Sequence, residues 1–308
     1  MPDLPRTTLG RTGLEVTKLG YGAMELRGSE RGGPEISDEE SDRVLNAVLD
    51  AGINLIDTSP DYGLSEERIG KFIAHRRGEY YLASKCGCAA GEFVGGAQDH
   101  LLSDANVRAG VEQSLRRMNT DYLDIVQFHR SLTREEFERE GALAEVLKLQ
   151  QEGKVRFIGV SGTLPQLREQ IAMGVWDEFQ IPYSALQREH EAVIAEASAA
   201  GAGIMIRGGA ARGTPDDWNG RSYYMLPGSI PQDRWEQAKL DELLDGLSRM
   251  EFTLRFTLSN PDLDTTIVGT KNLDHLTSNL DIARKGPLPV DVVAEAKRRL
   301  DATDSKPE

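Results

Sequence analysis

Cysteine is scarce in this chain of 308 residues, where it occurs only as Cys86 and Cys88. Two cysteines separated by one residue are too close for an ordinary disulfide. They also make a poor zinc pair, because the chain offers no second half of a ligand pattern. We therefore expect no disulfide framework and no metal site, and the shortage of cysteine favours a cytoplasmic protein.

Long apolar runs are absent as well. The first ten residues, MPDLPRTTLG, lack the apolar centre of a signal peptide, and nowhere do about 18 apolar residues follow one another. We expect neither secretion nor a membrane-spanning segment.

Positive charge is in short supply, since the formal net charge is -14. A field of this sign repels nucleic-acid phosphates and anionic membranes. The nearest candidates for a local basic patch are Arg76 with Arg77 and Arg116 with Arg117, and both pairs are typical of solvated helix faces. We expect no nucleic-acid partner and no membrane partner.

Apolar stretches of strand length alternate with stretches of helical periodicity. Ser37 followed by Glu40 is a capping-box pattern, and apolar residues then recur at helical spacing. The alternation predicts strands at residues 19–23, 53–58, 80–84, 123–128, 155–160, 178–181, 203–206 and 265–268. It predicts helices at residues 37–51, 66–76, 104–118, 142–151, 165–173, 190–199 and 235–257.

Eight apolar strands separated by helices predict a parallel sheet that closes into a (β/α)8 barrel, also called a TIM barrel. An open doubly wound sheet is the alternative, but no Gly-x-Gly-x-x-Gly turn follows the first strand. Residues 7–9 and 15–17 flank Gly10 and Gly13, which predicts a hairpin closing the barrel bottom. We expect one domain over residues 1–308, with a polar tail that frays after Leu300.

Titratable residues stand where three of the predicted strands end. Asp57 ends NLID, Lys85 ends YYLASK and His129 ends LDIVQFH, while Tyr62 follows in the loop SPDYG. Because the carboxyl ends of barrel strands share one rim, we expect the four side chains to meet. Taken singly, each has a structural explanation, such as helix capping, solvation or packing.

Together, the four residues suit the protonation of a carbonyl oxygen. A phenol is a weak acid with a pKa near 10, and a nearby ammonium favours its ionised form. We expect Lys85 to act on Tyr62 in this way, with Asp57 orienting the lysine and His129 hydrogen-bonding the substrate oxygen. Hydride must then come from a nicotinamide cofactor, because no side chain supplies it.

These motifs resemble those of the aldo-keto reductase family. The resemblance is carried by INLIDTSPDYGLSEERIG, ASKCG and DIVQFHR, and it extends to FIGVSG, FQIPYS and TTIVGTKNLDHLTSNL. It implies a catalytic tetrad of Asp57, Tyr62, Lys85 and His129, with Tyr62 as the general acid. It also implies reduction of an aldehyde or ketone to an alcohol with NADPH.

The resemblance assigns cofactor contacts along the rim. Ser161 and Gln180 match positions that hold the nicotinamide carboxamide, and Arg212 matches a diphosphate contact. The segment after the last strand matches the adenosine-phosphate site, where free backbone N–H groups at a helix start and Lys271 favour NADPH over NADH. The full set of expected cofactor contacts is Gly22, Asp57, Ser161, Gln180, Arg207, Arg212, Gly269, Thr270, Lys271, His275 and Asn279.

Two positions depart from the family pattern. Gly162 stands where asparagine usually follows the serine, so one carboxamide contact is missing or supplied elsewhere. Arg207 stands where many members have an aromatic residue that stacks on the nicotinamide ring. An arginine plane stacks too, or it brings positive charge to the cofactor or to an anionic substrate, and both interpretations stay open.

Three long connections leave the rim, at residues 24–35, 86–99 and 208–234, and long loops often bind substrate. The third carries Trp218, Tyr223 and Tyr224, which either wall an apolar pocket or pack against the barrel; with Met24 they are the candidate substrate contacts.

The leading functional hypothesis is thus an NADPH-dependent carbonyl reductase acting on a small molecule. A regulatory or sensor subunit that binds NADPH without turnover is the alternative, and a cofactor-free barrel isomerase or lyase is the third. The sequence leaves the natural substrate, the physiological direction and the oligomeric state open, with a monomer as the default.

Overall fold

Eight parallel strands close into a barrel in the computed structural model, which describes residues 3–29, 35–91, 100–210, 234–303 and 305–308. The strands follow one another around the barrel in the order β10-β3-β4-β5-β6-β7-β8-β9. The predicted TIM barrel is confirmed. The barrel strands are β3 (Leu19–Gly22), β4 (Leu55–Asp57), β5 (Tyr81–Cys86), β6 (Leu123–Phe128), β7 (Val155–Ser161), β8 (Glu178–Pro182), β9 (Gly203–Arg207) and β10 (Thr265–Val268).

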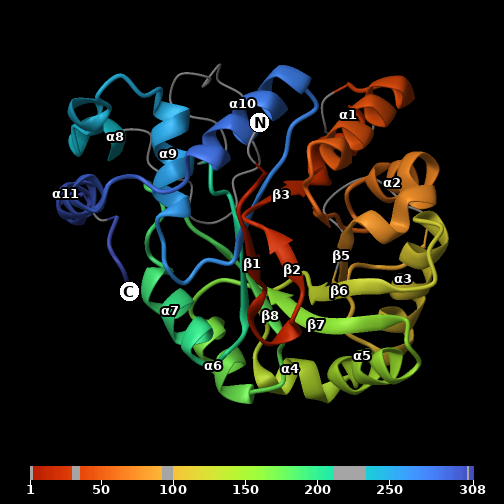
Figure 1. Ribbon diagram of the computed structural model, residues 1–308. Coiled ribbons are helices and arrows are strands. Elements are labelled where there is room, and N and C mark those ends of the chain that lie inside the picture. The colour runs from red at the N-terminus through yellow and green to blue at the C-terminus, as the bar shows by residue number, and fades with distance from the viewer. Residues whose placement is uncertain (1–2, 30–34, 92–99, 211–233, 304) are drawn as a thin grey trace.

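Helices surround the barrel as an outer layer (Figure 1). Their apolar faces pack on the strands and enclose a core of buried Leu, Ile, Val and Phe side chains, as an α/β barrel requires. The helices are α1 (Asp38–Asp50), α2 (Ser65–Ile73), α3 (Asp104–Arg117), α4 (Arg134–Arg139), α5 (Ala142–Gln151), α6 (Gln166–Met173), α7 (Glu191–Ala199), α8 (Arg234–Gln237), α9 (Arg249–Leu258), α10 (Leu273–Lys285) and α11 (Val290–Asp301).

The amino-terminal hairpin closes one end of the barrel, as predicted. Strands β1 (Arg6–Thr8) and β2 (Glu15–Thr17) pair in antiparallel fashion and lie across the barrel in Figure 1. Three apolar residues of this segment, Leu9, Leu14 and Val16, are buried against apolar side chains from inside the barrel. Close packing of this kind excludes water from the end of the barrel at which the strands begin.

One predicted helix is wrong in its extent. Residues 235–257 form α8, a 3-10 turn (Leu240–Leu243) and α9 instead of one helix. The chain takes positive φ angles at Lys239, Asp245 and Gly246, which an α-helix does not tolerate. Ser248 then starts α9 afresh by accepting a hydrogen bond from the backbone N–H of Glu251 at 3.0 Å.

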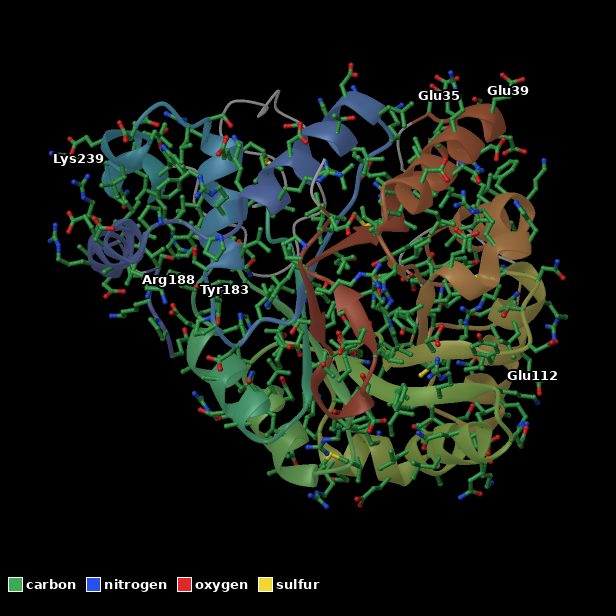
Figure 2. The ribbon with its side chains drawn as sticks, in the orientation of Figure 1. Glu35, Glu39, Glu112, Tyr183, Arg188 and Lys239 are labelled. Carbon is green, nitrogen blue, oxygen red and sulfur yellow. The ribbon has the colours of Figure 1, made fainter. Side chains whose placement is uncertain are left out.

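The carboxy-terminal tail lies against the barrel, although its polar sequence predicted fraying. Arg188, labelled in Figure 2, donates from Nη1 to Asp301 Oδ1 at 2.7 Å and to the carbonyl oxygen of Ser305 at 3.1 Å. Ser305 is buried, and its hydroxyl donates to the carbonyl oxygen of Ala185. A buried guanidinium needs hydrogen-bond acceptors, and the tail supplies one of them.

Within the part of the chain that the structure describes, every helix is too short or too polar to span a bilayer.

Candidate active site

A buried ion pair stands at the carboxyl ends of β4 and β5. Lys85 Nζ donates to Asp57 Oδ1 and, at 2.9 Å, to the carbonyl oxygen of Thr58. Both charged side chains are removed from solvent, with 0% and 3% of their surfaces exposed. Such a pair is maintained only when each charge has its partner, because an unpaired ion in this position would cost several kcal/mol. Asp57 therefore lies where its carboxylate can orient the Lys85 ammonium, which is the geometry that its expected role requires.

Gln180 reaches the same carboxylate from the opposite wall of the barrel. Its Nε2 donates to Asp57 Oδ1 at 2.9 Å, although β8 lies four strands away from β4. Its Oε1 accepts from Ser161 Oγ at 2.9 Å. The two residues expected to bind a carboxamide therefore lie side by side, and through Gln180 they are linked to the ion pair.

A second buried acid, Glu178, stands two residues before Gln180 on the same strand, β8. Its Oε2 accepts from Gln127 Nε2 at 3.0 Å, and burial raises the pKa of its carboxyl group well above the usual value. The neutral acid is the favoured form. Gly159 makes room for it, because a Cβ atom there would lie 2.3 Å from Glu178 Oε2.

Tyr62 differs from its prediction. Burial raises the pKa of its hydroxyl, and the negative charges of Asp57 and Asp61 raise it further, while Arg207 lowers it less strongly. The Tyr62 hydroxyl has no hydrogen bond to Lys85 or to any other residue in the described ranges. The expectation that Lys85 depresses this pKa is therefore not met, because Asp57 offsets the ammonium with a charge that also acts on Tyr62. The phenol keeps its proton.

His129 packs edge-on against the Tyr62 ring, with ring centroids 5.8 Å apart. Its Nδ1 lies 3.3 Å from Asp61 Oδ2, 3.2 Å from Ser59 Oγ and 3.5 Å from Cys88 Sγ. Burial raises the pKa of Asp61, but His129 and the hydroxyl of Ser59 lower it more, so the net shift is downward and the carboxylate is charged. A charged acceptor at Nδ1 fixes the orientation of an imidazole ring.

Several residues that surround Asp57, Tyr62, Lys85 and His129 in the structure were not predicted as part of the site. Asp61 and Ser59 stand in the same loop as Tyr62, in SPDYG, so their position was itself a signal. The sequence also contained a signal for Glu178, because a glutamate two residues before Gln180 lies on the same face of a buried strand. Nothing in the spacing of His100 pointed to His129, yet their ring centroids lie 5.8 Å apart.

The ends of β3 and β10 approach closely beside Asp57. Gly22 pairs with Asp57 in register, and a Cβ atom on Gly269 would lie 2.6 Å from the carbonyl oxygen of Gly22. Tyr21 links the two segments, because its hydroxyl donates a hydrogen bond to the carbonyl oxygen of Thr270 at 2.8 Å. Only glycine fits at position 269, so the rim presents bare backbone there.

The residues expected to contact a phosphate stand at the start of α10, where two backbone N–H groups already donate hydrogen bonds to a side chain. Asn272 Oδ1 accepts from the N–H groups of Asp274 and His275, at 2.7 and 3.4 Å. The exposed Lys271 donates from Nζ to the carbonyl oxygen of Glu35, a residue that Figure 2 labels at the outer end of α1. His275 is exposed and Asn279 is buried.

Lys271 borders an open hollow between the starts of α1 and α10. Glu35, Ile36, Ser37 and Glu40 complete its lining. Hydrogen bonds from Ser37 lower the pKa of Glu40, and the nearby Lys271 contributes to this shift. The hollow therefore combines two helix N-termini and a cation, which favour a phosphate, with two carboxylates, which oppose it.

The two departures from the family pattern have different surroundings. A Cβ atom on Gly162 would lie 2.9 Å from Leu167 Cδ2 and 3.1 Å from Gln170 Oε1, so both side chains would have to shift to admit the usual asparagine. Arg207 ends β9, pairs in register with Pro182, and acts electrostatically on Tyr62. Its guanidinium therefore belongs to the same rim as the tetrad.

The remaining predicted contacts divide between exposed and undescribed positions. Met24 lies in a 3-10 turn (Ala23–Leu26) and is 37% exposed, so it is accessible to a ligand. Arg212, Trp218, Tyr223 and Tyr224 lie outside the described residues.

A closed α/β barrel whose titratable groups gather where the strands end has the arrangement of a barrel enzyme. The sequence model of the Aldo/keto reductase family matches residues 18–300. The chain belongs to this family of oxidoreductases.

The names of similar proteins are consistent with membership of this family. The chain is 26% identical over 287 residues to the uncharacterized oxidoreductase YqkF of Bacillus subtilis, covering 89% of this chain and 90% of that protein. It is 27% identical over 309 residues to L-galactose dehydrogenase of Arabidopsis thaliana, covering 91% and 88%. Among solved structures, the holo form of aldo-keto reductase AKR11C1 from Bacillus halodurans aligns with a TM-score of 0.82 at 25% identity, covering 96% of each chain.

Aldo-keto reductases generally use nicotinamide cofactors, and the residues present fit one. The Ser161 hydroxyl and the Gln180 amide offer the polar groups that pair with a carboxamide. The absence of side chains at Gly22 and Gly269 lets the ends of β3 and β10 lie close together beside Asp57.

Proposed function

We propose that this protein reduces an aldehyde or ketone to an alcohol with NADPH, using Tyr62 as the proton donor. One observation carries the proposal: the Asp57–Lys85 ion pair, the Tyr62 ring and the His129 imidazole occupy one rim of the barrel, with Ser161 and Gln180 linked to the same carboxylate. Bound NADPH supplies the hydride that the carbonyl carbon receives.

Tyr62 meets the first requirement of a general acid, which is to hold its proton at neutral pH. Its raised pKa ensures this, and an alkoxide is a strong enough base to take a proton from a phenol. The proton leaves the Tyr62 hydroxyl for the carbonyl oxygen as the new C–H bond forms. The positive charge of Arg207 stabilises the phenolate that is left, since a cation favours the ionised form of a phenol.

His129 acts on the same oxygen. With Nδ1 directed at Asp61 and Ser59, the other ring nitrogen is left to donate to the substrate oxygen. An N–H donor there stabilises negative charge as it develops on the oxygen, which is how preorganised donors lower a barrier. Asp61 is a positioning residue in this scheme, because it acts through the imidazole.

NADPH is favoured over NADH by Lys271 at the start of α10. The additional phosphate of NADPH finds a cation and a helix N-terminus there. Glu35 and Glu40 weaken this preference, so we expect moderate rather than absolute discrimination.

The test is NADPH oxidation, followed by absorbance, with a panel of aldehydes, quinones and keto-sugars. Turnover of at least one carbonyl class together with saturable NADPH binding would support the proposal. Tight NADPH binding without turnover of any panel member would contradict it and favour a regulatory or sensor subunit. A protein that does not bind NADPH, as judged by fluorescence, would instead point to cofactor-free chemistry.

A further inference from the structure

Three ligand-type side chains from separate parts of the chain converge beside Tyr62. The sulfur of Cys88 and one ring nitrogen each of His100 and His129 all lie within 4.8 Å of one another. Cys88 follows β5, His129 follows β6, and His100 stands on the segment that leads to α3. The sequence predicted no metal site because Cys86 and Cys88 are too close together, and this cluster uses only one of them.

We propose that Cys88, His100 and His129 form a binding site for a divalent transition-metal ion of the zinc type, and that occupancy slows carbonyl reduction. Thiolate and imidazole are the ligands that zinc prefers, whereas calcium and magnesium prefer oxygen. Binding replaces the thiol proton of Cys88, so one proton is released for each ion bound.

The distances at His129 match those of a tetrahedral site. A zinc ion with bonds of about 2.3 Å to sulfur and about 2.0 Å to nitrogen or oxygen separates its sulfur and nitrogen ligands by about 3.6 Å and its nitrogen and oxygen ligands by about 3.3 Å. Cys88 Sγ lies 3.5 Å from His129 Nδ1, and Asp61 Oδ2 lies 3.3 Å from the same nitrogen. Closing the widest separation in the cluster requires a side-chain movement of about 1 Å.

Backbone and side-chain hydrogen bonds hold the ligand-bearing segments together. Cys88 and His100 form an isolated antiparallel bridge, and the next residue, Leu101, donates from its N–H to the carbonyl oxygen of Gly87 at 2.8 Å. Asn106 clamps both segments, because its Nδ2 donates to the carbonyl oxygens of Cys88 and Leu101 at 3.0 and 2.8 Å. Such outer contacts keep metal ligands in place before the ion arrives.

The surroundings also supply charge and access. Asp61 brings a carboxylate to His129, and a hydrogen bond from Ser59 orients it. The His129 and Asp61 side chains are 18% and 22% exposed, so an ion can reach them from solvent. The fourth coordination position of the ion is therefore filled either by the Asp61 carboxylate or by a water molecule.

Occupancy affects the reaction because His129 serves both sites. An ion bound to the imidazole fixes the position of the ring that is proposed to donate to the substrate oxygen, and a misplacement of about 1 Å can cost as much as about 100-fold in rate. This regulatory part rests on the proposed carbonyl reduction, whereas metal binding itself does not.

The first experiment measures binding without activity. The full-length protein is stripped with a chelator and titrated with Co²⁺, whose bond to a thiolate gives a near-ultraviolet charge-transfer absorption, and then with Zn²⁺. We expect one equivalent to bind with this absorption and to raise the melting temperature. The variants Cys88→Ser and His100→Ala should bind at least about tenfold more weakly, since even an outer-shell partner contributes this much. The controls Cys86→Ser and the exposed His75→Ala should bind as the unaltered protein does.

Equal affinity in the unaltered protein and in both ligand variants would overturn the site, as would Co²⁺ binding without the thiolate absorption. The second experiment adds Zn²⁺ during NADPH oxidation. We expect a loss of at least about tenfold in the unaltered protein and less than about twofold in His100→Ala. Full activity at saturating Zn²⁺ would overturn the regulatory role. A protein that binds metal as described but reduces no carbonyl would instead contradict the proposed function.

Discussion

The two ends of the barrel differ although they are built from the same strands. Near the hairpin, Leu55, Ala83, Ile125 and Met205 form an apolar layer. Two residues further along each strand, and hence on the same face, stand Asp57, Lys85, Gln127 and Arg207. A rise of roughly 7 Å for two strand residues thus separates a layer that excludes water from a layer of charges and amides.

The difference shows how one scaffold separates stability from chemistry. The apolar layer gains free energy by leaving water, at about 25 cal/mol per Å² of buried apolar surface. The polar layer bears the desolvation of an ion pair and of Glu178, and its hydrogen bonds offset only part of that cost. Substitutions at the two ends should therefore have separable effects on turnover and on unfolding.

The largest effect is expected for Lys85→Met at the polar end. The change leaves Asp57 buried without its cation, so turnover should fall on the order of 10³-fold and the free energy of unfolding by about 3–5 kcal/mol. The measurements are kcat for NADPH oxidation and urea unfolding. Lys18→Met is the matched control, because Lys18 lies near the hairpin end and donates to the carbonyl oxygen of Leu263. If both variants lost turnover equally, the distinction between the ends would be wrong.

Leu55→Ala should act in the opposite sense at the apolar end. Removing a fully buried leucine side chain costs about 2–5 kcal/mol of unfolding free energy, through lost burial and a cavity. The folded protein should keep its kcat within about twofold, since no reacting group is touched. Chemical denaturation and the activity of the folded fraction measure the two quantities, with Leu64→Ala, 40% exposed, as the control. A variant that is fully stable but inactive would contradict the comparison.

Lys271→Met tests phosphate recognition at the edge of the polar rim. Loss of the cation should raise KM for NADPH about tenfold, equivalent to about 1.4 kcal/mol, and leave KM for NADH nearly unchanged. Lys285→Met, at the other end of α10, is the control because it pairs with Glu251. Equal changes for both cofactors would remove Lys271 from phosphate recognition.

Glu178→Gln should have the smallest effect and appear only as a pH dependence. Because the folded-state pKa is raised, the stabilisation of the neutral acid is complete below the unfolded pKa of about 4.3 and is lost as the pH rises toward the folded value. The unaltered protein should therefore lose stability relative to the variant as the pH rises above about 4.3, by about 1.4 kcal/mol per pH unit while the folded acid stays neutral. Parallel curves of melting temperature against pH would show that Glu178 is ionised in the fold.

The sequence predicted most of the barrel because its signals are local. The capping box at Ser37 and Glu40 appears as predicted, and each barrel strand coincides with an apolar stretch of the sequence. Residues 235–257 misled because their apolar spacing suits a helix, while the backbone reversal at Asp245 and Gly246 carries only a weak signal.

The candidate site was predictable where residues lie at or next to the ends of strands, as Asp57, Lys85 and His129 do. The approach of Cys88 and His100 to His129 depends on how separate segments fold over the rim, which no spacing reveals. The pKa of Tyr62 was mispredicted for a similar reason. It depends on the balance of burial, Asp57, Asp61 and Arg207 in three dimensions, not on one neighbouring lysine.

The most direct test of the central claim is a single turnover of Tyr62→Phe with NADPH already bound, mixed rapidly with a carbonyl that the unaltered protein reduces. Oxidation of the cofactor should slow by at least about 100-fold, while the affinity for NADPH stays within about twofold. An unchanged single-turnover rate would show that the proton comes from another group and would contradict the proposed role of Tyr62.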